Sequence, residues 1–132
     1  MSDHAETQIV RHQNPLMLPP STSVMQAARQ MHSHHVSAVL VTEGDANLVG
    51  IFTERDAISR VLAAGRDPVA TTLAEVMTNN PETITPEHTA TEVLRLMQEA
   101  RVRHLPVVEG DKAVGIVSRN DFPEIASGGS PS

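Results

Sequence analysis

Residues 50–56 read Gly-Ile-Phe-Thr-Glu-Arg-Asp, and residues 115–121 read Gly-Ile-Val-Ser-Arg-Asn-Asp. The two stretches share a glycine, two apolar residues, a hydroxyl residue and an aspartate, at an offset of 115 − 50 = 65 residues. Upstream, segment 36–41 matches segment 102–107 at an offset of 66. The one-residue difference falls in a turn, where changes of length are tolerated best. The 132-residue chain therefore contains two copies of one structural unit.

Each copy reads as strand, helix, strand, strand and helix. Ser23 and Thr89 begin four-residue stretches that fit the helix capping box, and apolar residues follow at helical spacing. β-branched runs around a Gly-Asp turn then predict a hairpin in each copy. The expected extended pieces are 16–18 and 83–85, the expected hairpin strands are 36–41, 48–52, 105–108 and 113–117, and the expected inward helix residues are Val24, Ala27, Ala28, Met31, Ala90, Val93, Leu94 and Met97.

The second helix of each copy begins at the shared hydroxyl residue. Thr53 is the expected cap of a helix that ends at Gly65. The equivalent helix after Ser118 is expected to be short, because Pro123 lacks the N–H that would bond back to Arg119. In the first of these helices the residues expected to point inward are Ala57, Ile58, Val61 and Leu62.

These elements predict an α/β (α+β) chain that folds as a single small module. We expect the first domain at residues 7–62, a linker at 63–72 with Gly65 and Pro68, and the second domain at 73–125. The small polar ends, residues 1–6 and 127–132, are expected to be loose.

Composition narrows the function classes. The formal net charge of −6, with ten scattered Lys and Arg residues and no Trp or Tyr, argues against a nucleic-acid partner. No apolar stretch approaches the ~20 residues that cross a bilayer, and the first residues lack a signal-peptide pattern. We therefore expect a cytoplasmic protein without a membrane partner. The absence of cysteine excludes disulfides and thiolate sites.

The repeated Gly-apolar-apolar-Thr/Ser-x-x-Asp stretch and the order of elements resemble the CBS domain, named after cystathionine β-synthase. Residues 73–78, Leu-Ala-Glu-Val-Met-Thr, and 103–108, Arg-His-Leu-Pro-Val-Val, resemble further patterns of the family. The resemblance covers about residues 7–125 in both copies. The first copy departs from the pattern in having Leu40 where the second has Pro106. Two CBS domains in tandem form a Bateman module, and this chain is similar to the stand-alone bacterial type.

The resemblance implies a fold, a ligand class and an assembly. In this family the two domains pack through their sheets about a pseudo-twofold axis and leave two clefts. The clefts often bind adenosine-containing ligands such as AMP, ADP, ATP or S-adenosylmethionine, which implies energy sensing or a related regulatory role. No cofactor is required, and stand-alone modules of this size usually form homodimers.

The shared motif has a physical interpretation and an alternative. Thr53 and Ser118 lie at helix starts, where free N–H groups attract phosphate, and Asp56 and Asp121 could accept hydrogen bonds from ribose hydroxyls. The same Thr-x-x-Asp spacing also caps a helix without any ligand. The two interpretations are compatible.

The resemblance also assigns strand residues to each cleft. One cleft would combine Thr53 and Asp56 with Ile84, Arg103, His104 and Pro106. The other would combine Ser118 and Asp121 with Met17, Ser37 and Ala38. Because only the first has cations on its strand, we expect it to prefer the more highly phosphorylated ligand. Five apolar residues could either contact the adenine ring or simply belong to the core: Ile51, Phe52, Val39, Ile116 and Leu105.

Three competing interpretations stay open. His32, His34 and His35 cluster at a helix end, but no nearby carboxylate or thiolate completes a metal site, so we expect none. No nucleophile elbow, P-loop or His-Glu-x-x-His motif is present, so we expect no enzymatic activity and no catalytic residue. The main alternative to a nucleotide sensor is a module that binds a protein effector or only dimerises, with side chains filling its clefts.

Overall fold

The computed structural model describes residues 14–122. The predicted loose ends, 1–6 and 127–132, lie outside the described residues, as do the outer edges of the two predicted domains. The chain divides into two compact units. The N-terminal unit comprises Pro15–Pro81 and Gly110–Ala113, and the C-terminal unit comprises Asn14, Glu82–Glu109 and residues 114–122. No helix among the described residues is long and apolar enough to cross a membrane.

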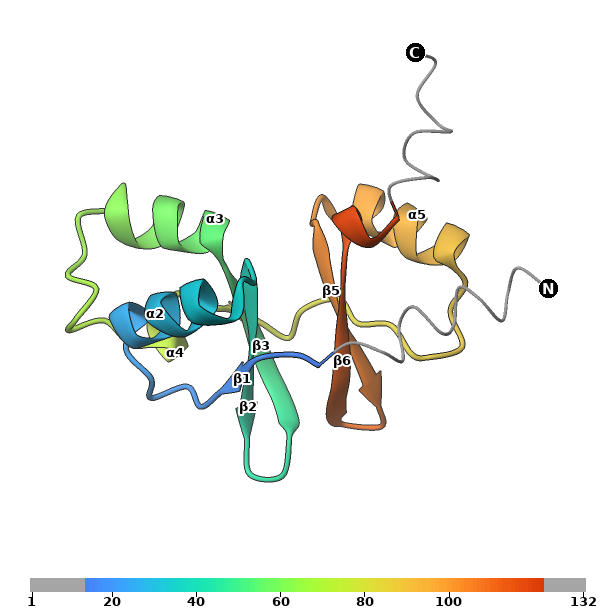
Figure 1. Ribbon diagram of the computed structural model, residues 1–132, viewed down its shortest axis with the longest axis horizontal. Helices are drawn as coiled ribbons and strands as arrows, with labels where there is room; N and C mark the ends of the chain where they lie inside the picture. The colour runs from blue at the N-terminus through green and yellow to red at the C-terminus, as the bar shows by residue number, and fades with distance from the viewer. Residues whose placement is uncertain (1–13, 123–132) are drawn as a thin grey trace, which may run out of the picture. The chain divides into compact units, whose positions relative to one another are not determined.

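The N-terminal unit contains the first copy of the repeat (Figure 1). Its elements are β1 (Met17–Leu18), α2 (Val24–His34), β2 (Ala38–Glu43), β3 (Asn47–Thr53), α3 (Glu54–Asp56), η1 (Ala57–Leu62), α4 (Leu73–Val76) and β4 (Thr78–Asn79). β1 runs parallel to β2, β2 and β3 form an antiparallel hairpin, and β4 pairs antiparallel with β3. The hairpin turn contains Gly44 at a φ of +58°, a conformation that glycine adopts at little cost.

The C-terminal unit repeats this plan. It contains α5 (Ala90–Ala100), β5 (His104–Glu109), most of β6 (Lys112–Ser118) and η2 (Arg119–Asp121), and β5 and β6 are hydrogen-bonded neighbours. A parallel bridge between Ile84 and Val107 takes the place that β1 has beside β2. α5, β5 and β6 begin 66, 66 and 65 residues after α2, β2 and β3. The internal repeat and its β-α-β-β order are thus confirmed, whereas the pseudo-twofold packing stays a prediction.

Each unit has its own apolar core, formed where helices cover one face of the strands. In Figure 1, α2 and α4 lie on the same side of the β2–β3 hairpin. The core of the N-terminal unit comprises Val24, Ala27, Met31, Val39, Val41, Phe52, Val61, Leu73 and Val76. The core of the C-terminal unit comprises Ile84, Ala90, Val93, Met97, Leu105, Val107, Val117 and Phe122.

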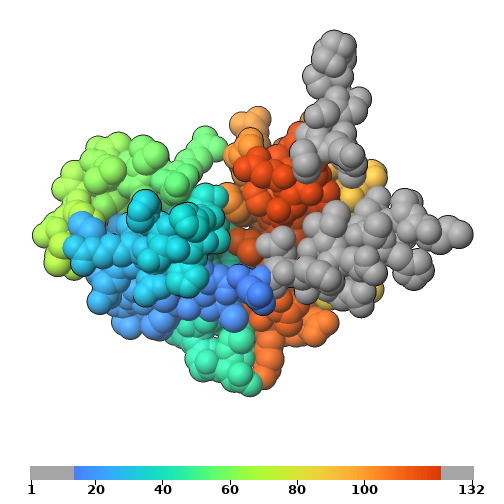
Figure 2. Space-filling view, viewed as in Figure 1, coloured from blue at the N-terminus to red at the C-terminus, as the bar shows by residue number. Residues whose placement is uncertain are grey.

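The buried faces of α2 and α5 were predicted well, whereas the buried face of the helix after Thr53 was not. Of the eight inward positions expected on α2 and α5, only Ala28 is exposed, and Leu94 is partly buried. On η1, Val61 is buried, but Ile58 is 60% exposed and Leu62 is 65% exposed, so their predicted inward position is wrong. The green η1 segment forms part of the surface in Figure 2.

The segment η1 also differs from an α-helix in its hydrogen-bond spacing. It is a π-helical segment, in which the N–H of Ala63 bonds to the carbonyl of Ile58 at 2.8 Å, an i→i+5 bond. The segment ends at Leu62, earlier than the predicted stop at Gly65, which lies in the following turn at a φ of +75°.

The predicted linker packs within the N-terminal unit. The carbonyls of Pro68 and Thr71 accept hydrogen bonds from the N–H groups of Met25 and Val24, at 3.0 and 2.9 Å. Thr71 is buried, and Leu73 and Val76 of α4 belong to the core of this unit. Residues 73–76, assigned by sequence to the second domain, thus complete the core of the N-terminal unit.

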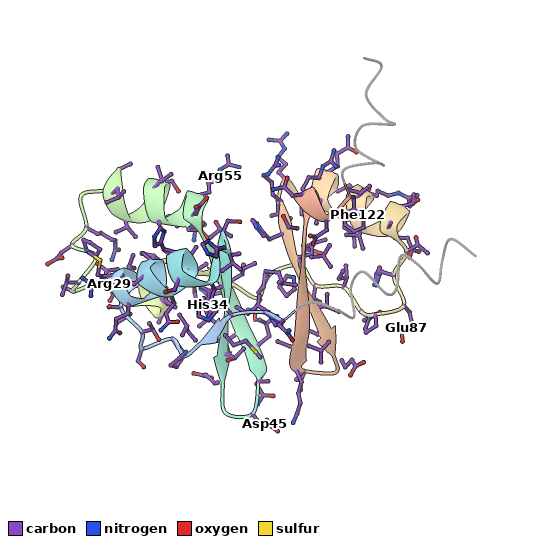
Figure 3. The ribbon with its side chains drawn as sticks, in the orientation of Figure 1. Arg29, His34, Asp45, Arg55, Glu87 and Phe122 are labelled. Atoms are coloured by element: carbon purple, nitrogen blue, oxygen red, sulfur yellow. The ribbon has the colours of Figure 1, made fainter. Side chains whose placement is uncertain are left out.

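The turn of the second hairpin also belongs to the N-terminal unit. The Leu48 N–H donates to the carbonyl of Asp111 at 3.1 Å, and the Ala113 N–H donates to the carbonyl of Ala46 at 2.8 Å. Lys112 forms an ion pair with Asp45, which Figure 3 labels at the turn of the first hairpin. β6 therefore begins in one unit and ends in the other, at Ser118.

Acid is expected to weaken two capping boxes. Hydrogen bonds from Thr89 hold the pKa of Glu92 below its ordinary 4.5, and bonds from Thr72 do the same for Glu75. A carboxyl whose folded pKa is lowered stabilises the fold above its unfolded pKa, and this stabilisation is lost as the pH falls through the folded pKa. We expect the melting temperature to fall below pH 4.5 and to fall less steeply in a Glu75→Gln, Glu92→Gln variant, measured by circular dichroism. Parallel pH profiles for the two proteins would contradict this.

Candidate functional site

The predicted site residues divide between the two units. Each predicted cleft draws on both units, so the clefts themselves stay a prediction. Within each unit the structure brings a helix start next to strand residues assigned to the other cleft. The N-terminal unit holds Met17, Ser37, Ala38, Thr53 and Asp56, and the C-terminal unit holds Ile84, Arg103, His104, Pro106, Ser118 and Asp121.

Thr53 and Asp56 form a complete capping box at the start of α3. The Thr53 N–H and hydroxyl donate to Asp56 Oδ2 at 3.0 and 3.1 Å, and the Asp56 N–H donates to Thr53 Oγ1 at 3.2 Å. Asp56 Oδ1 lies 3.7 Å from Arg60 Nε. The capping interpretation of the motif is therefore confirmed here. A ribose hydroxyl would have to share the Asp56 carboxylate with these partners.

The entry of β2 lies beside this capping box. Ala38 pairs with Thr53 in the hairpin, and the Glu54 N–H donates to the carbonyl of Ser37 at 2.9 Å. Ala38 is buried and Ser37 is half-buried. Met17 pairs with Leu40, two residues further along β2, and its side chain is exposed. A hydroxyl, a carboxylate and the first residues of a central strand thus meet at one place.

Ser118 and Asp121 repeat the arrangement in the C-terminal unit. The Ser118 N–H donates to Asp121 Oδ2 at 2.8 Å, and the Asn120 N–H donates to Ser118 Oγ at 3.3 Å. The Arg119 N–H donates to the carbonyl of Arg103 at 2.8 Å. This bond is the counterpart of the one between Glu54 and Ser37. Both helix starts are therefore attached in the same way to the entry of a central strand.

The four strand residues expected in the first cleft differ in how far their side chains are exposed. Arg103 is exposed, and its Nη2 lies 3.5 Å from Asn120 Oδ1. His104 is half-buried. Ile84 and Pro106 are almost fully buried, and the Ile84 N–H donates to the Pro106 carbonyl at 2.9 Å. Arg103 and His104 therefore retain polar groups near the surface, whereas Ile84 and Pro106 shape the strand pair behind them.

The candidate adenine walls belong largely to the cores. Val39 and Phe52 are part of the N-terminal core, and Leu105 is part of the C-terminal core. Ile51 is 7% exposed, and Ile116 is half-buried. Of these residues, Ile116 has the most surface available for contact with a ligand.

Sequence reasoning missed the two residues between Ser118 and Asp121. Arg119 and Asn120 both contact Arg103, one through its backbone and one through its side chain. The repeat alignment contained the signal, because Arg119 stands where the first copy has Glu54, a reversal of charge at an equivalent position.

The histidine cluster at the end of α2 has a local role. His34 Nδ1 lies 2.8 Å from the carbonyl of Gln30, one turn earlier (Figure 3). His35 adopts the left-handed conformation that ends the helix. Among residues 14–122, no three or more His, Asp or Glu side chains are placed to hold a metal ion. These contacts are those of a helix C-terminus.

Comparison with known proteins gives the family. The family model of the CBS domain matches residues 7–63 and 73–125. The CBS domain-containing protein CBSCBSPB3 of Arabidopsis thaliana is 38% identical over 108 residues, which are 82% of this chain and 19% of that protein. The chain thus spans about a fifth of the length of the Arabidopsis relatives that it matches first.

Solved structures agree with the fold. An uncharacterized conserved protein from Pyrococcus horikoshii is 34% identical with a TM-score of 0.84, over 96% of this chain and 95% of that one. The CBS domain pair of protein MJ0100 was solved in complex with 5′-methylthioadenosine and S-adenosyl-L-methionine. It is 26% identical with a TM-score of 0.82, and the match covers 95% of this chain and 97% of that one. With its two matched segments and its repeated strand-helix units, this chain belongs to the CBS-domain family, as a tandem pair of the regulatory Bateman type.

Proposed function

We propose that this chain is a non-enzymatic regulatory module that binds an adenosine-containing ligand, namely AMP, ADP, ATP or S-adenosylmethionine. The ligand would bind at sites that use Thr53 with Asp56 and Ser118 with Asp121. The protein would act in the cytoplasm as a homodimer and would signal to a protein effector through altered packing of its domains. A ligand shifts such an equilibrium only by its differential affinity for the two arrangements.

The observation that carries this proposal is the equivalent attachment of both helix starts to a central strand. The backbone bonds Glu54–Ser37 and Arg119–Arg103 place a hydroxyl, a carboxylate and a strand entry together in each unit. Such a group suits ribose hydroxyls and a neighbouring phosphate. The adenosine ligands bound by the CBS domain pair of protein MJ0100 support the same ligand class.

The two strand entries differ in charge, which predicts different ligands. Arg103 and His104 enter β5, whereas Ser37 and Ala38 enter β2. A guanidinium can bind phosphate oxygens in a bidentate manner. The site that contains Arg103 is therefore the one proposed to prefer the more highly phosphorylated ligand.

A second candidate is a module that only dimerises or binds a protein partner. The exposed Ile58 and Leu62 on η1 favour it, because large apolar side chains on one short helical segment suit a protein interface. The complete capping boxes also need no ligand. The two candidates make different predictions for purified protein.

The first test is ligand detection in purified protein. Because the chain has no Trp, Tyr or Cys, a copurified nucleotide would dominate its near-ultraviolet spectrum, where peptide bonds do not absorb. A ligand at about 100 times its dissociation constant should add about 2.7 kcal/mol to the free energy of unfolding. We expect at least one of the four ligands to raise the melting temperature. A blank spectrum and four unchanged melting curves would instead favour the partner-binding module.

Thr53→Ala separates ligand binding from capping. It should lower stability by about 1 kcal/mol through loss of the cap, and should weaken ligand affinity about tenfold through loss of the hydroxyl. Thr89→Ala is the matched control, because Thr89 forms the same capping box on α5 and has no proposed ligand role. It should cost similar stability and leave affinity unchanged, measured by calorimetric titration. Equal affinity losses in both variants would contradict the proposed site.

A further inference from the structure

A pocket of about 690 Å³ lies within the C-terminal unit, beside the second half of α5. Phe122, labelled in Figure 3, follows η2 and is buried in the same core as Val93 and Met97 of α5, which holds η2 close to this helix. The side of the pocket formed by α5 also includes apolar groups. The described residues that line it are Thr91, Leu94, Arg95, Met97, Gln98, Arg101, Val102, Arg103 and Arg119.

The charged residues that line this pocket are all positive. Residues 82–109 and 114–122 contain four arginines and no lysine, and all four arginines, Arg95, Arg101, Arg103 and Arg119, line the pocket. None of the carboxylates in these ranges is among the lining residues. None of the four guanidinium groups forms an ion pair with a carboxylate of residues 14–122. Four guanidinium groups without a close ion pair therefore line one pocket in a chain of net charge −6.

Arg119 supplies the second, independent observation. Its Nη1 is shielded from solvent and has no hydrogen-bond partner within the described part of the chain. The printed bonds around Arg119 are a backbone bond to the carbonyl of Arg103 and a contact of the Arg103 guanidinium with Asn120 Oδ1, and neither involves the Arg119 guanidinium. A buried guanidinium nitrogen without an acceptor is unfavourable unless an anion supplies one. An oxyanion in the pocket would provide that acceptor.

The other copy of the repeat indicates that the fold does not require this cluster. The positions equivalent to Arg95, Arg101, Arg103 and Arg119 hold Arg29, His35, Ser37 and Glu54. The two copies nevertheless form matching first helices, α2 and α5, matching hairpins and matching left-handed ends of these helices. Three of the four arginines thus belong to this unit alone, which points to a ligand rather than to folding.

We propose that this pocket is an oxyanion site that binds the phosphate groups of a polyphosphorylated small molecule. Planar guanidinium groups match phosphate oxygens in a bidentate manner, and four of them suit several negative charges better than one. Leu94, Met97 and Val102 add apolar surface for the rest of such a ligand. The proposal does not rest on the adenosine site, from which it takes only Arg103.

The probe is inorganic tripolyphosphate, titrated by calorimetry into the full chain at low salt. We expect binding that weakens as salt is raised, and a loss of at least about tenfold in Arg119→Gln. Arg29→Gln is the matched control, because Arg29 is the α2 counterpart of Arg95 and is labelled in Figure 3. It should leave the affinity unchanged. If Arg119→Gln does not fold, the double variant Arg95→Gln, Arg101→Gln is titrated in its place and should show the same loss of tripolyphosphate affinity. Both of its side chains are exposed, so their replacement should not disturb folding.

Two comparisons assign the source of the phosphate and separate this site from the adenosine site. ATP binding more tightly than tripolyphosphate, with the same loss in Arg119→Gln, would assign a nucleotide. Equal affinities would assign the polyphosphate group alone. Thr53→Ala should not change tripolyphosphate binding, so the two proposals can fail separately. The absence of tripolyphosphate binding, or equal losses in Arg119→Gln and Arg29→Gln, would overturn the oxyanion site.

Discussion

Leu73→Ala is expected to lower the free energy of unfolding by about 2–5 kcal/mol, the range for truncating a fully buried leucine. Leu73 has no exposed surface and belongs to the core of the N-terminal unit. Its N–H donates to the carbonyl of Thr22 at 2.9 Å, which fixes α4 beside the start of α2. A cavity at Leu73 would therefore be enclosed by helices and strands of the first copy. Chemical denaturation followed by circular dichroism measures the change.

The control for Leu73→Ala is Val69→Ala in the same connecting segment. Val69 is 66% exposed, so its truncation should change stability by less than about 0.5 kcal/mol. Hydrogen exchange should locate the loss of protection caused by Leu73→Ala in residues 15–72. A loss of protection centred on residues 82–122 would mean that Leu73 serves the second copy, as the sequence assignment had it.

The elements were predictable because both copies carry the same local signals. Thr89 is followed three residues later by Glu92, and the structure has the complete capping box there. For Ser23 the structure has the forward bond, from the Gln26 N–H at 3.1 Å. Strands and turns followed from β-branched runs and from Gly44 and Gly110, both at positive φ. Local propensity and repeat position agreed, and such consistency specifies a fold.

Long-range packing was less accessible to sequence reasoning. The assignment of α4 depends on which core receives Leu73, and nothing in the local pattern distinguishes the two cores. The i→i+5 bonds of η1 were likewise not predicted, because the sequence of this segment does not signal them. Short helical segments have little periodicity from which a face can be derived.

The sequence predicted which kinds of residue form the candidate site, but not how they are arranged in space. The Thr-x-x-Asp spacing is compatible with both a cap and a ligand contact, because both use the same hydroxyl and carboxylate. The arginines of the pocket are scattered in sequence at 95, 101, 103 and 119, and only the packing of η2 against α5 brings them together. A charge cluster assembled from separate elements leaves no local motif.

Gly50→Ala is expected to destabilise the N-terminal unit by about 1–3 kcal/mol, the usual cost of overpacking. A Cβ at Gly50 would lie 2.6 Å from Met77 Sδ and 2.8 Å from the carbonyl oxygen of Thr78. Gly50 pairs with Asn79, so β4 cannot move away without breaking its pairing with β3. The first residue of the Gly-apolar-apolar-Thr stretch is thus explained by close packing of β4.

Met77→Ala in the Gly50→Ala background tests this explanation. Removing the Met77 side chain relieves the contact with Sδ, but the carbonyl oxygen of Thr78 stays in place. We therefore expect the double variant to recover only part of the stability, after correction for Met77→Ala alone in a double-mutant cycle. If the glycine instead served a ligand, Gly50→Ala would keep its unfolding midpoint and lose only ligand affinity. Denaturation and ligand titration on the same variants distinguish these outcomes, because β3 leads from Gly50 directly to Thr53.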